Sequence, residues 1–288
     1  MADDGALGII GGSGLYEMEA LEVSEEVELS TPFGRPSDVY SVGSLEGRRV
    51  VFLPRHGRAH GILPGELNAR ANIWGFKKLG IGRIVSVSAV GSMKEQIEPL
   101  HVVLPDQFID RTRGRQDTFF GDGAVAHVSM ADPVCPDLHL SLQAACEAAG
   151  ATVWPDGSYV CIEGPTFSTK AESYLYRQWG VSVIGMTNVT EAKLAREAEI
   201  CYATVALVTD YDCWHEAEEA VTGEMVLENL RRNVATAREI VRRVAAQEVE
   251  PPACQCQDAL AHALVTRPED MPPETREKLE IIIGRYVE

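Results

Sequence analysis

The pattern of hydrophobic and polar residues divides the chain into short apolar runs and longer amphipathic segments. Three runs, at 7–10, 84–90 and 201–208, are almost continuously apolar. Such runs are typical of parallel strands covered on both faces, since a strand with one exposed face alternates instead. Shorter stretches predict further strands, at 38–42, 48–53, 101–104, 159–162 and 183–185.

The amphipathic segments predict helices between these strands. Segment 66–79 repeats apolar residues at helical intervals and is followed by Gly80, a typical stop. Two pairs with capping-box spacing mark the expected starts of helices 169–179 and 188–198: Thr169 with Glu172, and Asn188 with Glu191. Further helices are expected at 137–149, with Asp137 as the cap, at 222–247 and at 273–285.

A loop-like segment and a linker complete the pattern. Residues 106–132, which include His127, show no regular period, and loops of this length usually carry function or an interface. Residues 248–252 break the long helix with two prolines. Because strands and helices alternate without a change in composition, we predict one α/β domain with a mixed sheet over residues 1–247. Residues 248–288 then form a linker and a helical extension that packs on the body or on a neighbouring subunit.

The charge of the chain excludes several kinds of partner. A formal net charge of -17 repels nucleic acids and anionic membrane surfaces, so a small anionic substrate needs a local cluster of Arg and His. The sequence shows no signal-peptide pattern and no apolar run long enough to span a bilayer. We therefore expect a cytoplasmic protein without nucleic-acid or membrane partners.

The seven cysteines include no C-x-x-C pair, and their odd number fits reduced thiols better than a closed disulfide framework. Cys254 and Cys256, which are separated by one residue, stand out by their spacing. No metal site is expected.

Two aspartates, Asp210 and Asp212, follow the apolar run 201–208. Parallel sheets bind ligands outside the carboxyl ends of their strands, so this position predicts two carboxylates in a cleft. Burial raises the pKa of a carboxyl group, and one of a close pair can then hold a proton near neutral pH. Such a pair matches the N7 acceptor and 6-amino donor of an adenine base. Taken alone, the tetrapeptide 209–212 favours a plain turn, in which Asp is common.

Other polar groups follow neighbouring strands. The turn Gly11-Gly12-Ser13-Gly14 offers backbone N–H groups and a hydroxyl to an anion, although a plain tight turn has the same composition. Arg55 and His56 follow strand 48–53 and suit a tetrahedral oxyanion, with His56 as a second donor; a solvated turn is equally compatible. Ser88 and Ala89 are expected at the carboxyl end of strand 84–90, beside the strand that ends at Asp210.

A larger set of motifs points to a family. It comprises Gly11-Gly12-Ser13-Gly14, Thr31-Pro32-Phe33-Gly34-Pro36-Ser37, Arg55-His56-Gly57, Asn68-Ala-Arg-Ala-Asn-Ile-Trp74, Asp106-Gln-Phe-Ile-Asp-Arg-Thr112, Glu163-Gly-Pro165, Phe167-Ser168 and Thr209-Asp-Tyr-Asp-Cys-Trp214. Together these closely resemble the 5'-methylthioadenosine phosphorylases of the trimeric purine nucleoside phosphorylase family, over about residues 7–247. The resemblance implies a twisted, partly barrel-like sheet flanked by helices, in a trimer or a dimer of trimers.

The resemblance also implies roles for individual residues. Phosphate is bound by the positions that match Ser13, Arg55, His56, Ser88, Ala89 and Thr187. Base and ribose are surrounded by the positions that match Ala89, Phe167, Ser168, Met186, Asp210 and Asp212, with Asp210, Asp212 and Ser168 as the catalytic group. The 5' substituent is met by the positions that match Val226 and Leu227, and by His127 of the neighbouring subunit. The implied reaction is phosphorolysis of methylthioadenosine to adenine and 5-methylthioribose-1-phosphate, with inorganic phosphate as co-substrate and no metal or organic cofactor.

Some residues depart from the family pattern. Thr166 stands where an Arg is usual, and Gly223 is small for a position beside the 5' pocket, which would loosen selectivity toward adenosine or 5'-deoxyadenosine. Cys254 and Cys256 resemble cysteine pairs at the C-terminus of heat-stable archaeal relatives, and we expect them to be reduced. A broader 6-amino- or 6-oxopurine nucleoside phosphorylase, a hydrolytic nucleosidase and a non-catalytic nucleotide sensor remain as alternatives. Arg55 and His56 argue against the hydrolase, because water needs no anion site.

Overall fold

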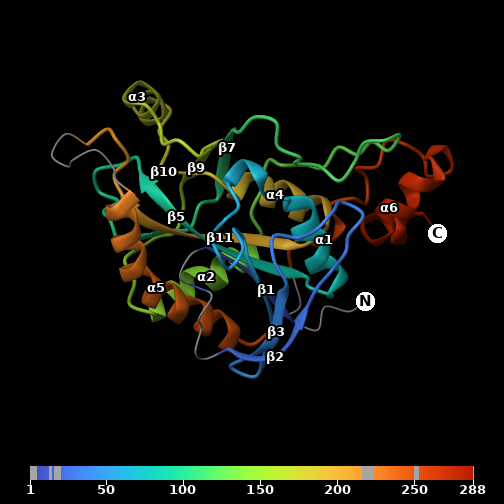
Figure 1. The fold of residues 1–288 in the computed structure, drawn as a ribbon, viewed down its shortest axis with the longest axis horizontal. Helices are drawn as coiled ribbons and strands as arrows, with labels where there is room; N and C mark the ends of the chain where they lie inside the picture. The colour runs from blue at the N-terminus through green and yellow to red at the C-terminus, as the bar shows by residue number, and fades with distance from the viewer. Residues whose placement is uncertain (1–4, 13–14, 16–20, 216–222, 250–252, 288) are drawn as a thin grey trace.

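A computed structural model describes residues 5–12, 15, 21–215, 223–249 and 253–287 (Figure 1). In this part of the chain eleven strands form one mixed sheet. The strands are β1 (Leu7–Gly11), β2 (Glu22–Val27), β3 (Tyr40–Leu45), β4 (Arg48–Pro54), β5 (Arg83–Ser92), β6 (Val102–Val103), β7 (Gln107–Arg111), β8 (Val153–Trp154), β9 (Ser158–Ile162), β10 (Val183–Gly185) and β11 (Cys201–Asp210).

Strand β5 is the branch point of the sheet. The main path runs β2-β3-β4-β1-β5-β10-β9-β7, while β11 pairs with β5 and β6, and β8 pairs with β6. The first half of β5 pairs in parallel with β1, whereas its last residues pair antiparallel with β10. Because β11 follows β5 in parallel over almost its whole length, both strands end at the same edge. β5 therefore pairs with three strands: β1, β10 and β11.

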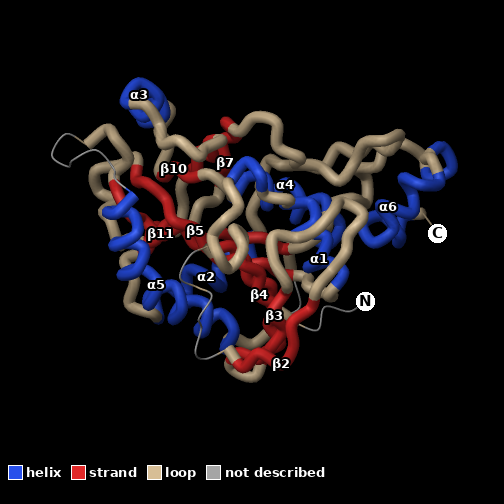
Figure 2. The backbone as a smooth tube through the Cα atoms, in the orientation of Figure 1, coloured by secondary structure: helices blue, strands red, loops and turns tan. Residues whose placement is uncertain are grey.

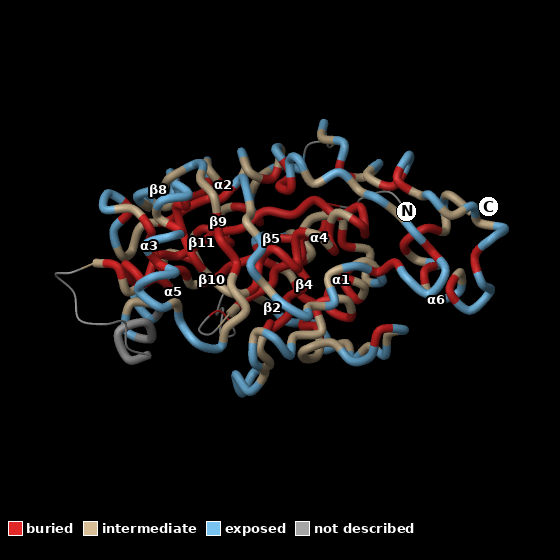
Figure 3. Tube along the Cα trace, turned by 90° about the horizontal axis from the view of Figure 1, so that it is seen from above, coloured by how far each residue is buried: buried red, intermediate tan, exposed pale blue. Residues whose placement is uncertain are grey.

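Helices cover both faces of the sheet (Figures 1 and 2). They are α1 (Ala69–Lys78), α2 (Pro136–Ala148), α3 (Lys170–Gln178), α4 (Asn188–Glu197), α5 (Gly223–Ala246) and α6 (Pro273–Ile283). Helices α1, α4 and α6 contribute to one apolar cluster, and α2 and α5 to another. All ten residues of β11 are buried, which explains its continuous apolar sequence. In Figure 3 buried residues run through β5 and β11, while exposed residues gather on the outer loops.

The residues beyond 252 pack against the body of the same chain. Leu260, Ala263 and Leu279 are buried in the cluster that contains α1 and α4. The backbone N–H of His127 donates to the carbonyl of Ala263 at 2.8 Å. Figure 1 shows α6 and the C-terminus at one end of the molecule, far from α3. None of the described helices is both long and apolar enough to cross a membrane.

The structure corrects several predicted elements. Three strands were not predicted: β2, β8, and β7, which lies inside the expected loop 106–132. The capping box of Thr169 and Glu172 is confirmed, whereas the one assigned to Asn188 and Glu191 is wrong. Helix α4 begins after Thr187, and both side chains turn inward to other partners.

Two further helix starts also differ. Helix α1 begins at Ala69, because the Asn68 side chain accepts from the N–H of Ala71 and caps the helix there. Asp137 lies in the first turn of α2 rather than at its cap. Its carboxylate instead accepts from the N–H groups of Ala253 and Cys254, at 2.8 and 2.9 Å, and so ties the tail to the start of α2.

Candidate active site

A cavity of about 420 Å³ opens at the carboxyl ends of β5, β10 and β11. It brings together most of the residues predicted from the sequence: Arg55, His56, Ser88, Ala89, Phe167, Ser168, Met186, Thr187, Asp210 and Asp212. These residues come from four strand ends and the loop after β9, so the sheet topology, rather than sequence proximity, assembles them. This is the position where parallel sheets bind ligands.

The remaining predicted residues are not in this group. Ser13 lies outside the described residues, as do the side chains of Val226 and Leu227 in α5. The same holds for the side-chain position of Gly223. His127 is exposed and lines a different cavity, formed between the loop before α2 and the C-terminal tail.

The two aspartates are held in a fixed relation at the end of β11. Asp212 donates its backbone N–H to Oδ1 of Asp210 at 2.8 Å, and the Thr209 hydroxyl donates to Oδ2 at 2.7 Å. Asp212 has a positive φ of 54°, which turns the chain sharply after Tyr211. Both carboxylates are buried, and burial raises the pKa of Asp212 above its ordinary value. Asp212 therefore holds a proton more readily than a solvent-exposed carboxyl group, next to the hydrogen-bonded carboxylate of Asp210.

Neighbouring elements fix the end of β11. Asn233 of α5, fully buried, donates to the carbonyl of Val208 at 2.8 Å, and Asn229 donates to the carbonyl of Thr209 at 2.5 Å. On the other side, a Cβ at Gly91 would lie 2.9 Å from Oδ1 of Asp210, so a side chain at this position of β5 would displace the Asp210 carboxylate. The two asparagines were missed from the sequence because polar residues in an amphipathic helix are usually solvent-facing.

Arg55 is buried and held by a network behind the cavity. Its Nε donates to Oε1 of Glu191 at 2.5 Å, and its Nη2 donates to the hydroxyl of Ser86 at 2.6 Å. The carboxylate of Glu191 also accepts from Ser86 and from the Tyr202 hydroxyl, at 2.7 and 2.9 Å. With a side chain only 2 % exposed, Arg55 has its charge balanced by Glu191 and its geometry set in advance.

The front of the guanidinium remains next to the cavity. Nη1 donates to the carbonyl of Val87 at 3.1 Å, and it lies 3.8 Å from the position that a Cβ of Gly12 would occupy. Gly12, the residue directly after β1, is thus adjacent to Arg55.

His56 differs from the expected second donor. Its Nδ1 lies 2.8 Å from the carbonyl oxygen of Ile62, and since a carbonyl only accepts, Nδ1 carries the proton. Burial, together with the charge of Arg55, lowers the pKa of His56 to about 4. At neutral pH the ring is therefore neutral and presents Nε2 as an acceptor. It fits the O–H of a protonated oxyanion.

Two hydroxyl groups in the cavity point to a ligand. Within the described residues, the buried Oγ atoms of Ser88 and Ser168 have no hydrogen-bond partner. A buried polar group left unpaired costs about 1 to 3 kcal/mol, so such groups are rare unless a ligand or water completes them. Ser88 lies on the β5 side of the cavity and Ser168 in the loop after β9.

That loop is fixed by a residue the sequence did not single out. Arg115 donates through Nε to Oε1 of Glu163 at 2.8 Å, and through Nη2 to the carbonyls of Glu163 and Met186, at 2.7 and 3.2 Å. Phe167 is half exposed at the cavity mouth, and Thr166 is exposed beside it. Arg115 thus places a buried positive charge under the loop that holds Thr166. Thr166 itself stands at the position where the family pattern has an Arg.

Comparisons with known proteins agree with this arrangement. Residues 6–246 match the family model described as "Phosphorylase superfamily". The chain is 57% identical to an S-methyl-5'-thioadenosine phosphorylase of Geobacter sulfurreducens, covering 98% of this chain and 99% of the relative. A relative of the same name from Thermosynechococcus vestitus is 55% identical, and the match covers 98% of this chain and 99% of the relative.

Solved structures show the same fold. A methylthioadenosine phosphorylase from an antarctic soil metagenomic library superposes with a TM-score of 0.89 at 49% identity, covering 96% of this chain and 98% of that one. A mutant adenosine/methylthioadenosine phosphorylase of Schistosoma mansoni in complex with methylthioadenosine superposes with a TM-score of 0.80 at 38% identity. The match covers 84% of this chain and 90% of that one. The chain therefore belongs to the phosphorylase superfamily and, within it, to the family of the methylthioadenosine phosphorylases.

Proposed function

We propose that the protein cleaves 5'-methylthioadenosine with inorganic phosphate, giving adenine and 5-methylthioribose-1-phosphate. The observation that carries the proposal is the pairing, in one cavity, of an anion site around Arg55 with two buried carboxylates at Asp210 and Asp212. The names of the relatives support the same substrate.

The phosphate site is formed around Arg55. Nη1 of Arg55, the unpartnered hydroxyl of Ser88 and the backbone of Gly12 border one part of the cavity. Thr187 lies there as well, and Ser13 completes the set by family resemblance. His56 accepts the phosphate O–H through Nε2, which orients an unprotonated oxygen toward C1' of the ribose. Positioning of this kind replaces the entropy loss of a bimolecular collision and needs no metal or organic cofactor.

The base site is formed by the aspartate pair. As the glycosidic bond breaks, negative charge develops on the adenine, and a proton or strong hydrogen bond at N7 stabilises it. One carboxyl group of the pair accepts from the 6-amino group while the other donates to N7. Asp210, whose orientation is fixed by two protein donors, accepts from the 6-amino group and so holds the base as it leaves. Ser168, Met186 and Phe167 border the ribose.

The 5' substituent is bound at an interface. Val226 and Leu227 belong to the segment that faces it by family resemblance, and His127 enters from the neighbouring subunit of a trimer. In one chain His127 is exposed and away from the cavity, which is compatible with such a shared site. Mixing inactive Asp210→Ala and His127→Ala variants should restore about one quarter of the activity after random subunit exchange. No recovery after verified exchange would refute the shared site.

The proposed reaction is tested by following methylthioadenosine cleavage against phosphate concentration, with both products identified by mass spectrometry. We expect saturable dependence on phosphate and stoichiometric 5-methylthioribose-1-phosphate. Cleavage at the same rate without phosphate, with free 5-methylthioribose as the product, would instead show a hydrolase. Binding without turnover in phosphate would show a sensor.

A further inference from the structure

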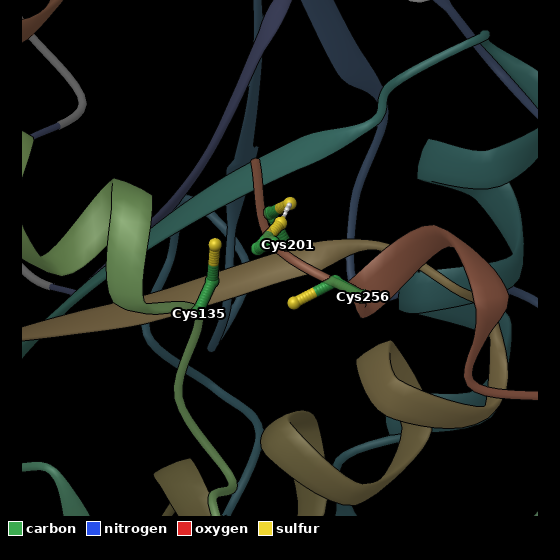
Figure 4. Close-up of side chains that lie close together, drawn as sticks. Cys135, Cys201 and Cys256 are labelled. Atoms are coloured by element: carbon green, nitrogen blue, oxygen red, sulfur yellow. Dashed lines mark hydrogen bonds between the residues drawn. The ribbon is translucent and has the colours of Figure 1, made fainter. Parts of the chain in front are cut away.

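Four cysteines meet at the amino end of β11, away from the cavity. Cys201 is the first residue of β11, Cys135 directly precedes α2, and Cys254 and Cys256 belong to the C-terminal tail. Their sulfur atoms all lie within 4.8 Å of one another, and those of Cys201 and Cys254 are 3.5 Å apart. Figure 4 shows Cys135, Cys201 and Cys256 approaching one another from three different segments.

We propose that these four cysteines bind one Zn²⁺ ion and thereby fasten the tail to the domain. Structural zinc sites are tetrahedral, with Zn–S distances of about 2.3 Å, which places the sulfurs about 3.8 Å apart. The cluster is close to this spacing: one pair is slightly shorter, and the widest separation needs to contract by about 1 Å. Four thiolates are a soft ligand set that selects zinc over the hard cations Mg²⁺ and Ca²⁺.

The backbone holds the ligands in place independently of their thiols. The N–H of Cys135 donates to the carbonyl of Tyr202, and that of Cys201 donates to Gly82, both at 2.9 Å. The tail is positioned by Asp137, whose carboxylate accepts from the N–H of Cys254 at 2.9 Å. A site whose ligands are already fixed loses less entropy when the ion binds.

The burial of the cluster matches a closed structural site. Cys135, Cys201 and Cys256 are at most 4 % exposed, and Cys254 is half-buried. A cavity of about 1220 Å³ beside Cys254 and Cys256 gives an ion a path to the site. All four positions of a tetrahedral ion are filled by protein, so no position is open for a substrate. β11 is ten residues long, so the site lies about 30 Å from Asp210 and is separate from the proposed chemistry.

The surrounding charges favour thiolates. Binding Zn²⁺ releases the thiol protons without any change of oxidation state, and four thiolates leave a net charge of about -2 on the site. Nη1 of Arg196 lies 3.8 Å from Sγ of Cys256, and Cys135 occupies the cap position of α2, where the helix dipole favours negative charge.

The rival state of the cluster is a pair of disulfides. Forming two disulfides needs an external oxidant and bonds the sulfurs in pairs. A metal ion instead binds all four sulfurs at once, which fits their mutual closeness. The two states can be told apart by labelling with a thiol-blocking reagent under denaturing, metal-free conditions. Cysteines in disulfides do not react with the reagent, whereas cysteines that had bound a metal ion do. The proposal does not depend on the reaction at the other end of the strand, and its test requires no substrate.

The test is metal analysis of the protein purified from zinc-supplemented cells without a metal-affinity step. We expect about one zinc per chain. Cys256→Ser and Cys201→Ser should lower the zinc content at least tenfold. Cys146→Ser, which alters a buried cysteine of α2 outside the cluster, is the matched control and should keep the ion. Exchange with Co²⁺ should give thiolate-to-cobalt charge-transfer absorption in the wild type and in the control alone.

Three results would overturn the proposal: zinc-free protein whose four cysteines are oxidised, zinc-free protein with four free thiols, or zinc retained by Cys256→Ser. Iron in place of zinc would overturn the choice of ion. Should Cys201→Ser fail to fold, Cys254→Ser provides the same measurement from a half-buried tail position. A chelator should lower the melting temperature of the wild type by several degrees and leave that of Cys254→Ser unchanged.

Discussion

At its carboxyl end β11 presents Asp210 to a cavity, whereas at its amino end it places Cys201 in a cluster of thiols. The first end leaves hydrogen-bonding capacity unused, in the hydroxyls of Ser88 and Ser168. At the second end Cys135, Cys201 and Cys256 are buried, and backbone hydrogen bonds fix Cys135 and Cys201. A site that binds and releases a substrate needs polar groups that are free to bind it. A structural metal site has all its ligand positions filled by protein. The same buried strand serves both because its two ends lie about 30 Å apart.

The largest expected effect concerns the network behind the cavity. Replacing Glu191 by Ala leaves the Arg55 charge buried without its partner, and breaking such a pair costs about 3 to 5 kcal/mol. We expect the Glu191→Ala variant to lose that much stability in urea unfolding. Glu191→Gln, which keeps an acceptor, should lose less. Equal stability of both variants and the wild type would mean that the network does not preorganise the anion site.

A smaller effect is expected for the unpartnered hydroxyl on the phosphate side. Ser88→Ala removes a hydrogen-bond donor to bound phosphate and should raise the phosphate KM about tenfold, equivalent to about 1.4 kcal/mol. Because the hydroxyl has no protein partner, stability should be unchanged or slightly higher. Thr190→Ala is a control, since Thr190 Oγ1 is equally buried and unpartnered but does not line the cavity. A phosphate KM unaffected by Ser88→Ala would remove Ser88 from the phosphate site.

The smallest effect is the pH dependence of His56. Its pKa in the folded protein is about 4, below the unfolded value of about 6.5, so the unfolded state binds more protons between these values. His56 should therefore favour unfolding as the pH falls from about 6.5 toward 4, and have no effect above that window. Urea titrations at pH 7 and 5 should show a smaller loss of stability in His56→Asn than in the wild type. An identical loss in both would contradict a neutral His56.

The central strands of the fold were predictable because their burial is visible in short stretches of sequence. β5 and β11 are buried on both faces, and such strands carry continuous apolar runs. β2 was missed because its sequence EVSEEV has no buried face and it forms only by pairing with β3. β7 is similarly polar, and it is specified by its pairing with β9.

The site residues that were missed depend on long-range contacts. Glu191 fits a capping box with Asn188, but its actual partner, Arg55, is 136 residues away. Asn229 and Asn233 contact β11 only because α5 packs on it. The spacing of Cys254 and Cys256 was visible in the sequence, but their meeting with Cys135 and Cys201 required the fold.

The central claim is that Asp210, at the carboxyl end of β11, recognises the 6-amino group of the substrate. It is tested most directly by comparing kcat/KM for methylthioadenosine and methylthioinosine. A carboxylate accepts from a 6-amino group but faces a 6-oxo group oxygen to oxygen, so we expect a preference for methylthioadenosine of about 100-fold. Asp210→Asn, whose amide can donate, should lose most of this activity and gain relative activity on methylthioinosine. Similar kcat/KM for both nucleosides in the wild type would contradict the claim.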